Sequence, residues 1–139
     1  MTQEHKELLL KDLCGRLPYG VKIKTPSDFW TSEEGICELK EIFKGGDGLF
    51  RIGDIGALIE YSKPYLFPLS SMTEEQRKEY ESLCVKETSE CTDLYGIIFT
   101  KDYYYDTVES IDYLYKNHID IRGLIPMGLA EDATKLDIY

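Results

Sequence analysis

The chain has 139 residues, is 42% hydrophobic and 30% charged, and carries a formal net charge of −10 at pH 7. Its length and composition suit one globular domain that needs neither disulfides nor metal ions to form a core. The excess of acidic residues argues against direct binding of DNA or RNA, and the lack of a long apolar run argues against a membrane span, so we expect a cytoplasmic protein.

The N-terminal residues predict a helix. Leucines recur at helical spacing between residues 2 and 17, and this spacing places them on one helix face. Pro18 and Gly20 predict the end of the helix, because the residue before a proline disfavours the helical conformation and glycine permits a turn.

Residues 20–69 predict short strands joined by tight turns. Apolar and charged residues alternate over 21–25, a glycine-rich turn lies at 45–48, and a second alternation covers 57–61. The proline-containing residues 63–68 predict an edge strand, because proline has no N–H to donate to a sheet. Short strands of this kind cannot bury both faces by themselves, so they predict a small bent antiparallel sheet or an SH3-like barrel.

The second half of the chain predicts two helices. Thr73 and Gln76 have the spacing of a capping box, which predicts a helix that ends at about residue 86. Asp106 begins a similar pattern, and an apolar stripe follows it as far as His118.

The segment between these helices predicts a loop over 88–93 and a strand over 94–100, where apolar and β-branched residues gather. The whole chain therefore predicts an α+β fold. We expect a single domain over residues 1–139, with a strand-rich core at about 20–69 and a helical second half at about 70–139.

The cysteines indicate no chemistry of their own. Cys14, Cys37, Cys84 and Cys91 form no C-x-x-C pair, so we expect reduced, buried thiols rather than metal ligands. Cys14 and Cys84 also fall late in predicted helices, where the helix dipole disfavours a reactive thiolate. The sequence thus predicts no catalytic residue, no cofactor and no metal site.

One acidic cluster leaves an enzymatic alternative open. Asp106, Glu109 and Asp112 recur at spacings of three along the predicted helix, and His118 lies near its end. Carboxylates that share one helix face are suitable ligands for Mg²⁺, which makes a small metal-assisted hydrolase-type enzyme an alternative function. The more ordinary interpretation is that the acids stabilise the first helical turn and that His118 caps or packs against the helix end.

Aromatic residues indicate a candidate interaction surface. The consecutive Tyr103, Tyr104 and Tyr105 cannot all face a core from one strand, so we expect at least one to be exposed. Tyrosine offers a large contact area at low entropic cost, and Trp30 adds a further aromatic group from a predicted loop. We take these four residues as candidate protein-interface residues.

Three stretches of the chain are distinctive. They are residues 8–22 (LLLKDLCGRLPYGVK), residues 63–76 (KPYLFPLSSMTEEQ) and residues 109–133 (ESIDYLYKNHIDIRGLIPMGLAEDA). Together they resemble a family of short uncharacterised proteins of gut anaerobic bacteria and their phages. The family has no assigned activity, so the resemblance implies a cytosolic protein of a bacterium, phage or mobile element and no functional residue.

These observations favour a non-catalytic accessory or protein-binding domain. Residues 70–139 carry fifteen Asp and Glu against seven Lys and Arg, and such an acidic surface attracts a basic partner protein. A second alternative is an inhibitor that mimics nucleic acid with a row of carboxylates. We expect another protein as the partner, rather than nucleic acid or a membrane, and the sequence leaves the oligomeric state open.

Overall fold

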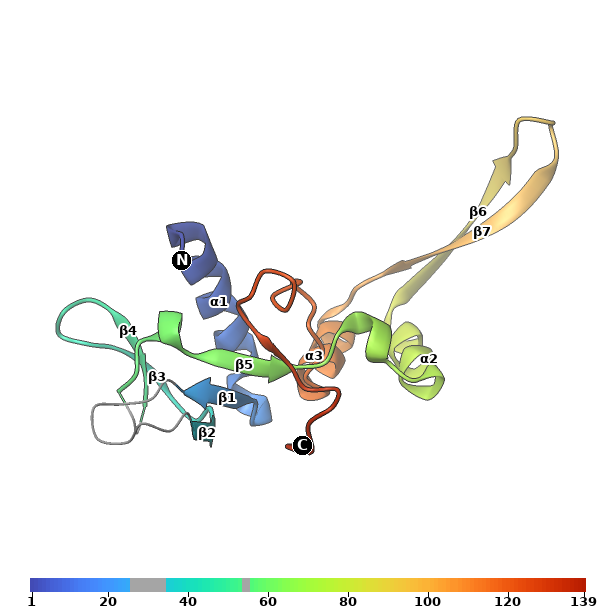
Figure 1. Cartoon of the computed structure of the whole chain (residues 1–139). Helices are drawn as coiled ribbons and strands as arrows, with labels where there is room; N and C mark the ends of the chain where they lie inside the picture. The colour runs from blue at the N-terminus through green and yellow to red at the C-terminus, as the bar shows by residue number, and fades with distance from the viewer. Residues whose placement is uncertain (26–34, 54–55) are drawn as a thin grey trace. The chain divides into compact units, whose positions relative to one another are not determined.

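The computed structural model of the chain describes residues 1–25, 35–53 and 56–139 (Figure 1). These residues form two compact units, of which the first comprises Met1–Ser71 and Tyr115–Tyr139 and the second comprises Met72–Leu114. Both units contain helices and strands, which confirms the predicted α+β class. The single-domain organisation stays a prediction.

The first unit begins with helix α1, Gln3–Arg16, which is capped by the side chain of Thr2. A short 3-10 turn follows at Leu17–Tyr19, and Gly20 ends it with a φ of 68°. Such a left-handed conformation suits glycine because it has no Cβ. The predicted N-terminal helix and its predicted end are therefore confirmed.

A four-stranded sheet follows, in the order β2-β1-β5-β8. Its strands are β1 (Lys22–Thr25), β2 (Gly35–Glu38), β5 (Lys63–Leu66) and β8 (Glu131–Asp132). Strand β8 runs parallel to β5, whereas the other pairs are antiparallel, so the sheet is mixed rather than purely antiparallel as predicted. The expected small sheet is present, and the strands of the described residues do not close into a barrel.

The predicted edge position of residues 63–68 is wrong. Strand β5 lies between β1 and β8, and Pro64 is fully buried. Only Tyr65 and Leu66 pair with β8. On its β8 side, Pro64 therefore has no strand partner, so the missing N–H of proline leaves no ladder hydrogen bond unmade there.

A separate two-stranded sheet is formed by β3 (Ile42–Lys44) and β4 (Phe50–Ile52). The turn that joins them contains Gly48 with a φ of 80°, which confirms the predicted glycine-rich hairpin turn. The predicted strand over 57–61 is wrong, because Ile59–Tyr61 form a 3-10 turn.

The core of the first unit combines side chains from both of its sequence segments. Helix α1 and the sheet meet residues that follow Tyr115, far along the chain. The buried hydrophobic cluster consists of Leu9, Leu13, Val21, Ile23, Leu39, Ile52, Ile59, Leu66, Leu124, Leu129 and Ala130. The predicted strand-rich core at residues 20–69 is therefore completed by side chains from outside that range.

The second unit consists of α2 (Glu74–Leu83), β6 (Val85–Thr92), β7 (Ile98–Tyr105) and most of α3 (Val108–Lys116). Strand β6 replaces the loop predicted over 88–93. Its alternating positions are all exposed or half-buried, so the sequence shows no apolar period that would have predicted a strand. None of the described helices is long and apolar enough to cross a membrane.

Both helices of the second unit begin with reciprocal hydrogen bonds. In the predicted capping box, the Thr73 hydroxyl accepts from the Gln76 backbone N–H at 3.1 Å, and the Gln76 side chain accepts from the Thr73 N–H at 3.0 Å. At the start of α3 the same arrangement joins Thr107 and Ser110 at 2.8 and 3.1 Å. The capping residue there is Thr107, one position later than the predicted Asp106.

Candidate functional site

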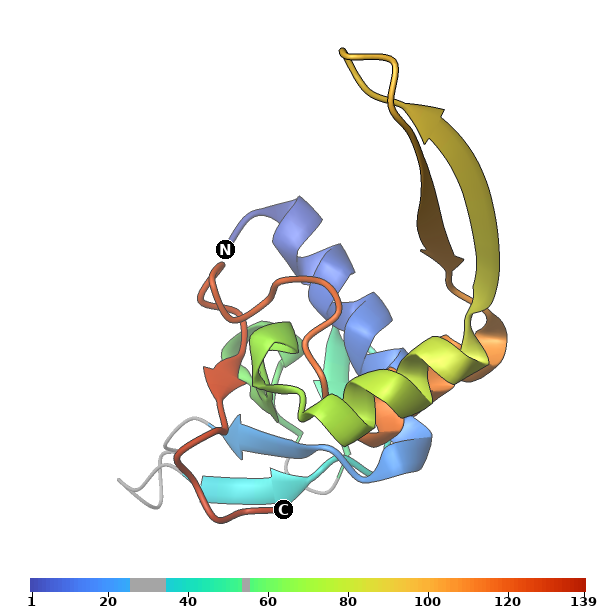
Figure 2. The ribbon, with the colours of Figure 1, turned by 90° about the vertical axis from the view of Figure 1, so that its right-hand side faces the viewer.

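Strands β6 and β7 form a two-stranded antiparallel ribbon, which we call the β6–β7 ribbon (residues 85–105). Eight residue pairs join the strands, from Val85 opposite Tyr105 to Thr92 opposite Ile98. Figures 1 and 2 both show this ribbon extending away from α2 and the adjoining start of α3. Most of its length therefore has no helix of the second unit packed on either face.

The turn at the end of the ribbon follows from its sequence. The Asp93 carboxylate accepts hydrogen bonds from the backbone N–H groups of Tyr95 at 2.8 Å and Ile97 at 2.9 Å. Gly96 has a φ of 77°, as the left-handed position of a three-residue hairpin loop requires. The exposed side chains at this tip are thus held on an ordered turn.

The base of the ribbon is fastened to both helices of the second unit. The Thr107 hydroxyl donates to the Leu83 carbonyl at 2.7 Å, and the Tyr80 hydroxyl donates to the Asp106 carboxylate. Burial and this hydrogen bond raise the pKa of Tyr80, so its hydroxyl remains a donor. The helices therefore hold the base while the ribbon itself stays uncovered.

One face of the ribbon is rich in aromatic side chains. Successive side chains in a strand point to opposite faces, so the register places five odd-numbered apolar or aromatic side chains together. We call this the aromatic face, and it consists of Val85, Cys91, Phe99, Tyr103 and Tyr105. All except the half-buried Cys91 are exposed, so apolar groups on this face are in contact with water. The Ser89–Lys101 pair lies on the same face between Cys91 and Phe99 at one end and Val85, Tyr103 and Tyr105 at the other, and Glu87 lies opposite Tyr103.

The opposite face is polar and makes its own contacts. The Asp102 carboxylate accepts a hydrogen bond from the Thr88 hydroxyl at 2.8 Å and lies 3.3 Å from the Lys86 ammonium. These two interactions hold the pKa of Asp102 below its usual range. The polar face therefore contains an ion pair, whereas the three aromatic residues Phe99, Tyr103 and Tyr105 lie on the aromatic face.

The tip adds the most exposed apolar side chains of the ribbon. Leu94 is 101% exposed and Tyr95 is 88% exposed. An isolated surface leucine is ordinary, but an exposed leucine next to an exposed tyrosine forms a small apolar patch at the tip. The tip and the aromatic face together form the strongest candidate binding surface in the second unit.

Only some of the candidate interface residues predicted from the sequence lie on this surface. Tyr103, Tyr104 and Tyr105 are 37%, 44% and 51% exposed, which confirms that at least one of them is exposed. Tyr103 and Tyr105 belong to the aromatic face, whereas Tyr104 lies on the polar face. Trp30 lies outside the described residues.

The structure does not assemble the enzymatic alternative. Asp106 accepts from Tyr80 and from the Ser110 hydroxyl, the latter at 3.0 Å, so this carboxylate serves the base of the ribbon. Within the described ranges, no three His, Cys, Asp or Glu side chains group as metal ligands. Glu109, Asp112 and His118 are among the described residues, and they belong to no such group.

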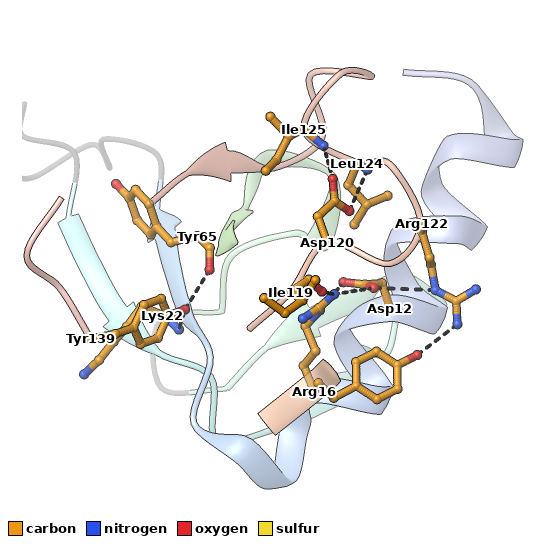
Figure 3. Close-up of polar contacts among 11 residues, drawn as sticks. Asp12, Arg16, Lys22, Tyr65, Ile119, Asp120, Arg122, Leu124, Ile125 and Tyr139 are labelled. Atoms are coloured by element: carbon orange, nitrogen blue, oxygen red, sulfur yellow. Dashed lines mark hydrogen bonds and ion pairs between the residues drawn. The ribbon is translucent and has the colours of Figure 1, made fainter. Parts of the chain in front are cut away.

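The first unit contains a buried ionic network that the sequence interpretation missed (Figure 3). Arg16 and Asp12 are both fully buried and lie 2.6 Å apart, and Arg16 also donates to the Ile119 carbonyl at 2.6 Å. Arg122 lies 3.5 Å from Asp12 and donates to the Tyr115 hydroxyl at 3.1 Å. The i,i+4 spacing of Asp12 and Arg16 was the available signal, but it usually marks an exposed pair.

His118 packs beside this network instead of acting as the charged cap of a helix end. Its ring stacks on the Tyr139 ring with centroids 3.9 Å apart. Burial, and then the positive charge of Arg16, lower the pKa of His118 to about 4. The neutral imidazole is therefore the native form, which supports the packing interpretation and corrects the cationic one.

Tyr139 fastens the last residues to the sheet. Its hydroxyl accepts from the Lys22 backbone N–H at 2.8 Å and donates to the Tyr65 carbonyl at 2.7 Å, as Figure 3 shows. Burial raises its pKa to about 12. Both hydrogen bonds therefore persist at neutral pH.

Lowering the pH should destabilise the first unit through His118. Its pKa is about 4 in the folded chain against an ordinary 6.5, so the unfolded chain binds the proton more tightly and stability falls as pH drops from 6.5 towards 4. The loss is at most about 1.4 kcal/mol for each pH unit. Urea unfolding at several pH values should show this slope in the wild type and a flatter one in His118→Gln; equal slopes would contradict it.

The predicted burial of the cysteines is only partly right. Cys14 is exposed, and Cys37, Cys84 and Cys91 are half-buried. None of these four described cysteines forms a disulfide, as the expected reduced state requires. The buried stripe of α1 consists of Leu9, Asp12, Leu13 and Arg16. Cys14 lies outside this stripe and is therefore exposed.

A shallow depression of about 300 Å³ in the first unit lies between the start of α1 and β4. An ion pair of 2.7 Å joins Lys6 and Glu60 at its wall, and Leu10 and Phe50 contribute apolar surface. The lining contains no cysteine, serine or histidine. It therefore offers no Ser–His or Cys–His pair.

No protein-family model, curated protein or solved structure matches this chain. The proposal of a function therefore rests on the geometry of the chain itself.

Proposed function

We propose that the chain is a non-catalytic accessory domain that binds another protein in the cytoplasm through the aromatic face and tip of the β6–β7 ribbon. The observation that carries this proposal is the exposure of an ordered apolar surface on a two-stranded ribbon. A ribbon of two strands is only marginally stable in water. A partner that covers the aromatic face would remove apolar area from water and stabilise the ribbon.

The charge of the second unit supports a partner with basic residues around an apolar patch. Residues 72–114 contain eleven Asp and Glu against four Lys and Arg. Opposite charges at the rim of an interface speed association and make it sensitive to salt. We therefore propose that added salt weakens binding of this partner, as it does for other charged interfaces.

The resemblance to proteins of gut bacteria and their phages is consistent with such an accessory role. We propose that the chain belongs to that family, and that it is encoded by a bacterium, a phage or another mobile element. Purification of the chain from such a cell, followed by identification of what accompanies it, is the corresponding experiment.

Substituting tyrosines of the aromatic face should weaken partner binding. We expect the double variant Tyr103→Ser/Tyr105→Ser to bind the partner at least about 30-fold more weakly, since buried interface tyrosines are frequent hot spots. Tyr104→Ser is the matched control, because it removes the same side chain from the polar face. The measurement is capture from native lysate at low salt, followed by titration with the purified partner.

The three proteins give distinct results in this experiment. Stoichiometric capture by wild type and Tyr104→Ser, but not by the double variant, supports the proposal. Equal capture by all three proteins, or no stoichiometric partner at low salt, contradicts it. Circular dichroism of the double variant establishes that the loss does not come from unfolding.

A further inference from the structure

The β6–β7 ribbon leaves the outer edge of β6 unpaired among the described residues. The register determines which backbone groups lie on that edge. The Asp93 N–H donates to the Ile97 carbonyl at 3.0 Å, so odd-numbered residues of β6 direct their backbone groups towards β7. The backbone groups of Lys86, Thr88 and Glu90 therefore point outwards, where another strand can pair with them.

The residues on this edge are complementary to themselves. Two copies of β6 that pair antiparallel must place even-numbered residues opposite even-numbered ones, because only those direct their backbone groups outwards. A two-fold axis at Thr88 places Lys86 of each copy opposite Glu90 of the other. The same register places Val85 opposite Cys91 and Glu87 opposite Ser89 on the aromatic face, so no like charges lie opposite each other there, while opposite charges meet on the polar face.

Neighbouring registers lack this complementarity. A two-fold axis at Lys86, Glu87 or Glu90 places that residue opposite its own copy, and like charges directly opposite each other are destabilising. An axis at Ser89 forms no pair of opposite charges and places Val85 opposite an aspartate. The register centred on Thr88 is therefore the favoured one of these five.

We infer that the second copy of this chain is one partner of the β6–β7 ribbon, and that the two β6 strands pair about Thr88 to form a four-stranded antiparallel sheet. This inference rests on the proposed function, because it names a partner of the same ribbon, but it uses the edge rather than the aromatic face. Four strands are sufficient for a stable sheet where two are marginal. Pairing also places the two aromatic faces on the same side of the sheet.

The net charge of the second unit opposes this association over long distances. Salt screens such repulsion beyond about 8 Å at physiological ionic strength. The two pairs of Lys86 and Glu90 lie within that distance and so act against the repulsion. The dimer is accordingly expected at physiological salt.

Sedimentation equilibrium of the full chain tests the dimer directly. Over a range of protein concentrations at physiological salt, the wild type should reach twice the 16.1 kDa of one chain. Thr88→Pro should weaken the dimer at least about tenfold, because it removes the N–H at the centre of the new ladder. Thr100→Pro is the matched control, since Thr100 occupies the equivalent outward position on β7, and it should dimerise like the wild type.

Charge reversal tests the register. Glu90→Lys alone places two lysines opposite each other, and Lys86→Glu alone places two glutamates opposite each other, so each should weaken dimerisation about tenfold to a hundredfold. Mixing the two variant chains restores both attractive pairs. The mixture should therefore form heterodimers with nearly the wild-type affinity, which native mass spectrometry measures.

The outcomes separate this inference from the proposed function. A wild type that stays monomeric at every concentration overturns the dimer, as does a dimer that survives Thr88→Pro or a mixture that remains monomeric. The capture experiment with Tyr103→Ser/Tyr105→Ser tests the aromatic face independently. If the wild type captures a protein but forms no dimer, only the pairing of the β6 edges is rejected. If it forms the β6-paired dimer but captures no protein, only the binding of another protein by the aromatic face is rejected.

Discussion

Asp12→Ala is expected to lower the free energy of unfolding by about 3–5 kcal/mol, the range observed when one partner of a buried ion pair is removed. The substitution leaves the fully buried Arg16 guanidinium without its carboxylate at 2.6 Å. It also removes the carboxylate that lies 3.5 Å from Arg122. Urea unfolding, with the midpoint and slope compared between variant and wild type, measures this loss.

An exposed ion pair provides the control for this prediction. Lys6 and Glu60 lie 2.7 Å apart, with side chains that are partly exposed, and Glu60→Gln should cost less than about 1 kcal/mol. The double variant Asp12→Leu/Arg16→Met should recover part of the loss, because replacing both charges leaves none unpaired in the core. An Asp12→Ala protein as stable as the control variant would show that the pair is not buried in solution.

Asp120→Ala is expected to lower the free energy of unfolding by about 3 kcal/mol. The Asp120 carboxylate is buried and accepts from the backbone N–H groups of Leu124 at 2.8 Å and Ile125 at 2.9 Å. Hydrogen bonds to a charged acceptor contribute about 1.5–3 kcal/mol each, and unpaired buried donors add a desolvation cost. Thermal or urea unfolding measures the effect.

Asp132→Ala is the matched control for Asp120→Ala. The exposed Asp132 also accepts two hydrogen bonds, which come from the Thr134 N–H at 2.9 Å and the Thr134 hydroxyl at 2.7 Å. Water replaces these bonds when they are lost, so the control should cost less than about 1 kcal/mol. Equal losses of stability in the two variants would mean that the burial of Asp120 does not increase the contribution of its hydrogen bonds to the free energy of unfolding.

Both predictions concern how the residues after Tyr115 pack against the N-terminal segment of the first unit. Arg16 in α1 holds the Ile119 carbonyl, and Asp120 organises the turn that places Leu124 in the hydrophobic core. The two buried charged groups therefore position apolar side chains from distant parts of the chain. They are structural in this arrangement, and we assign no chemistry to them.

Local sequence signals predicted the helices and the tight turns. The capping box at Thr73, the turn at Gly20 that follows α1 and the hairpin turn at Gly48 were all confirmed. Each depends on interactions within a few residues, which the sequence contains in full. The exposure of at least one of the three consecutive tyrosines followed in the same way, from the alternation of side chains in any strand.

The α+β class, the helix starts and the three consecutive tyrosines at 103–105 could be predicted from the order of the residues. The internal position of β5, the burial of Asp12 and Arg16, and the pairing of β6 with β7 that leaves an aromatic face uncovered became known from the folded chain. These features depend on residues that are far apart in the sequence. Burial and strand order depend on which remote segments meet, and a ribbon exposed on both faces carries no apolar period from which its pairing could be predicted.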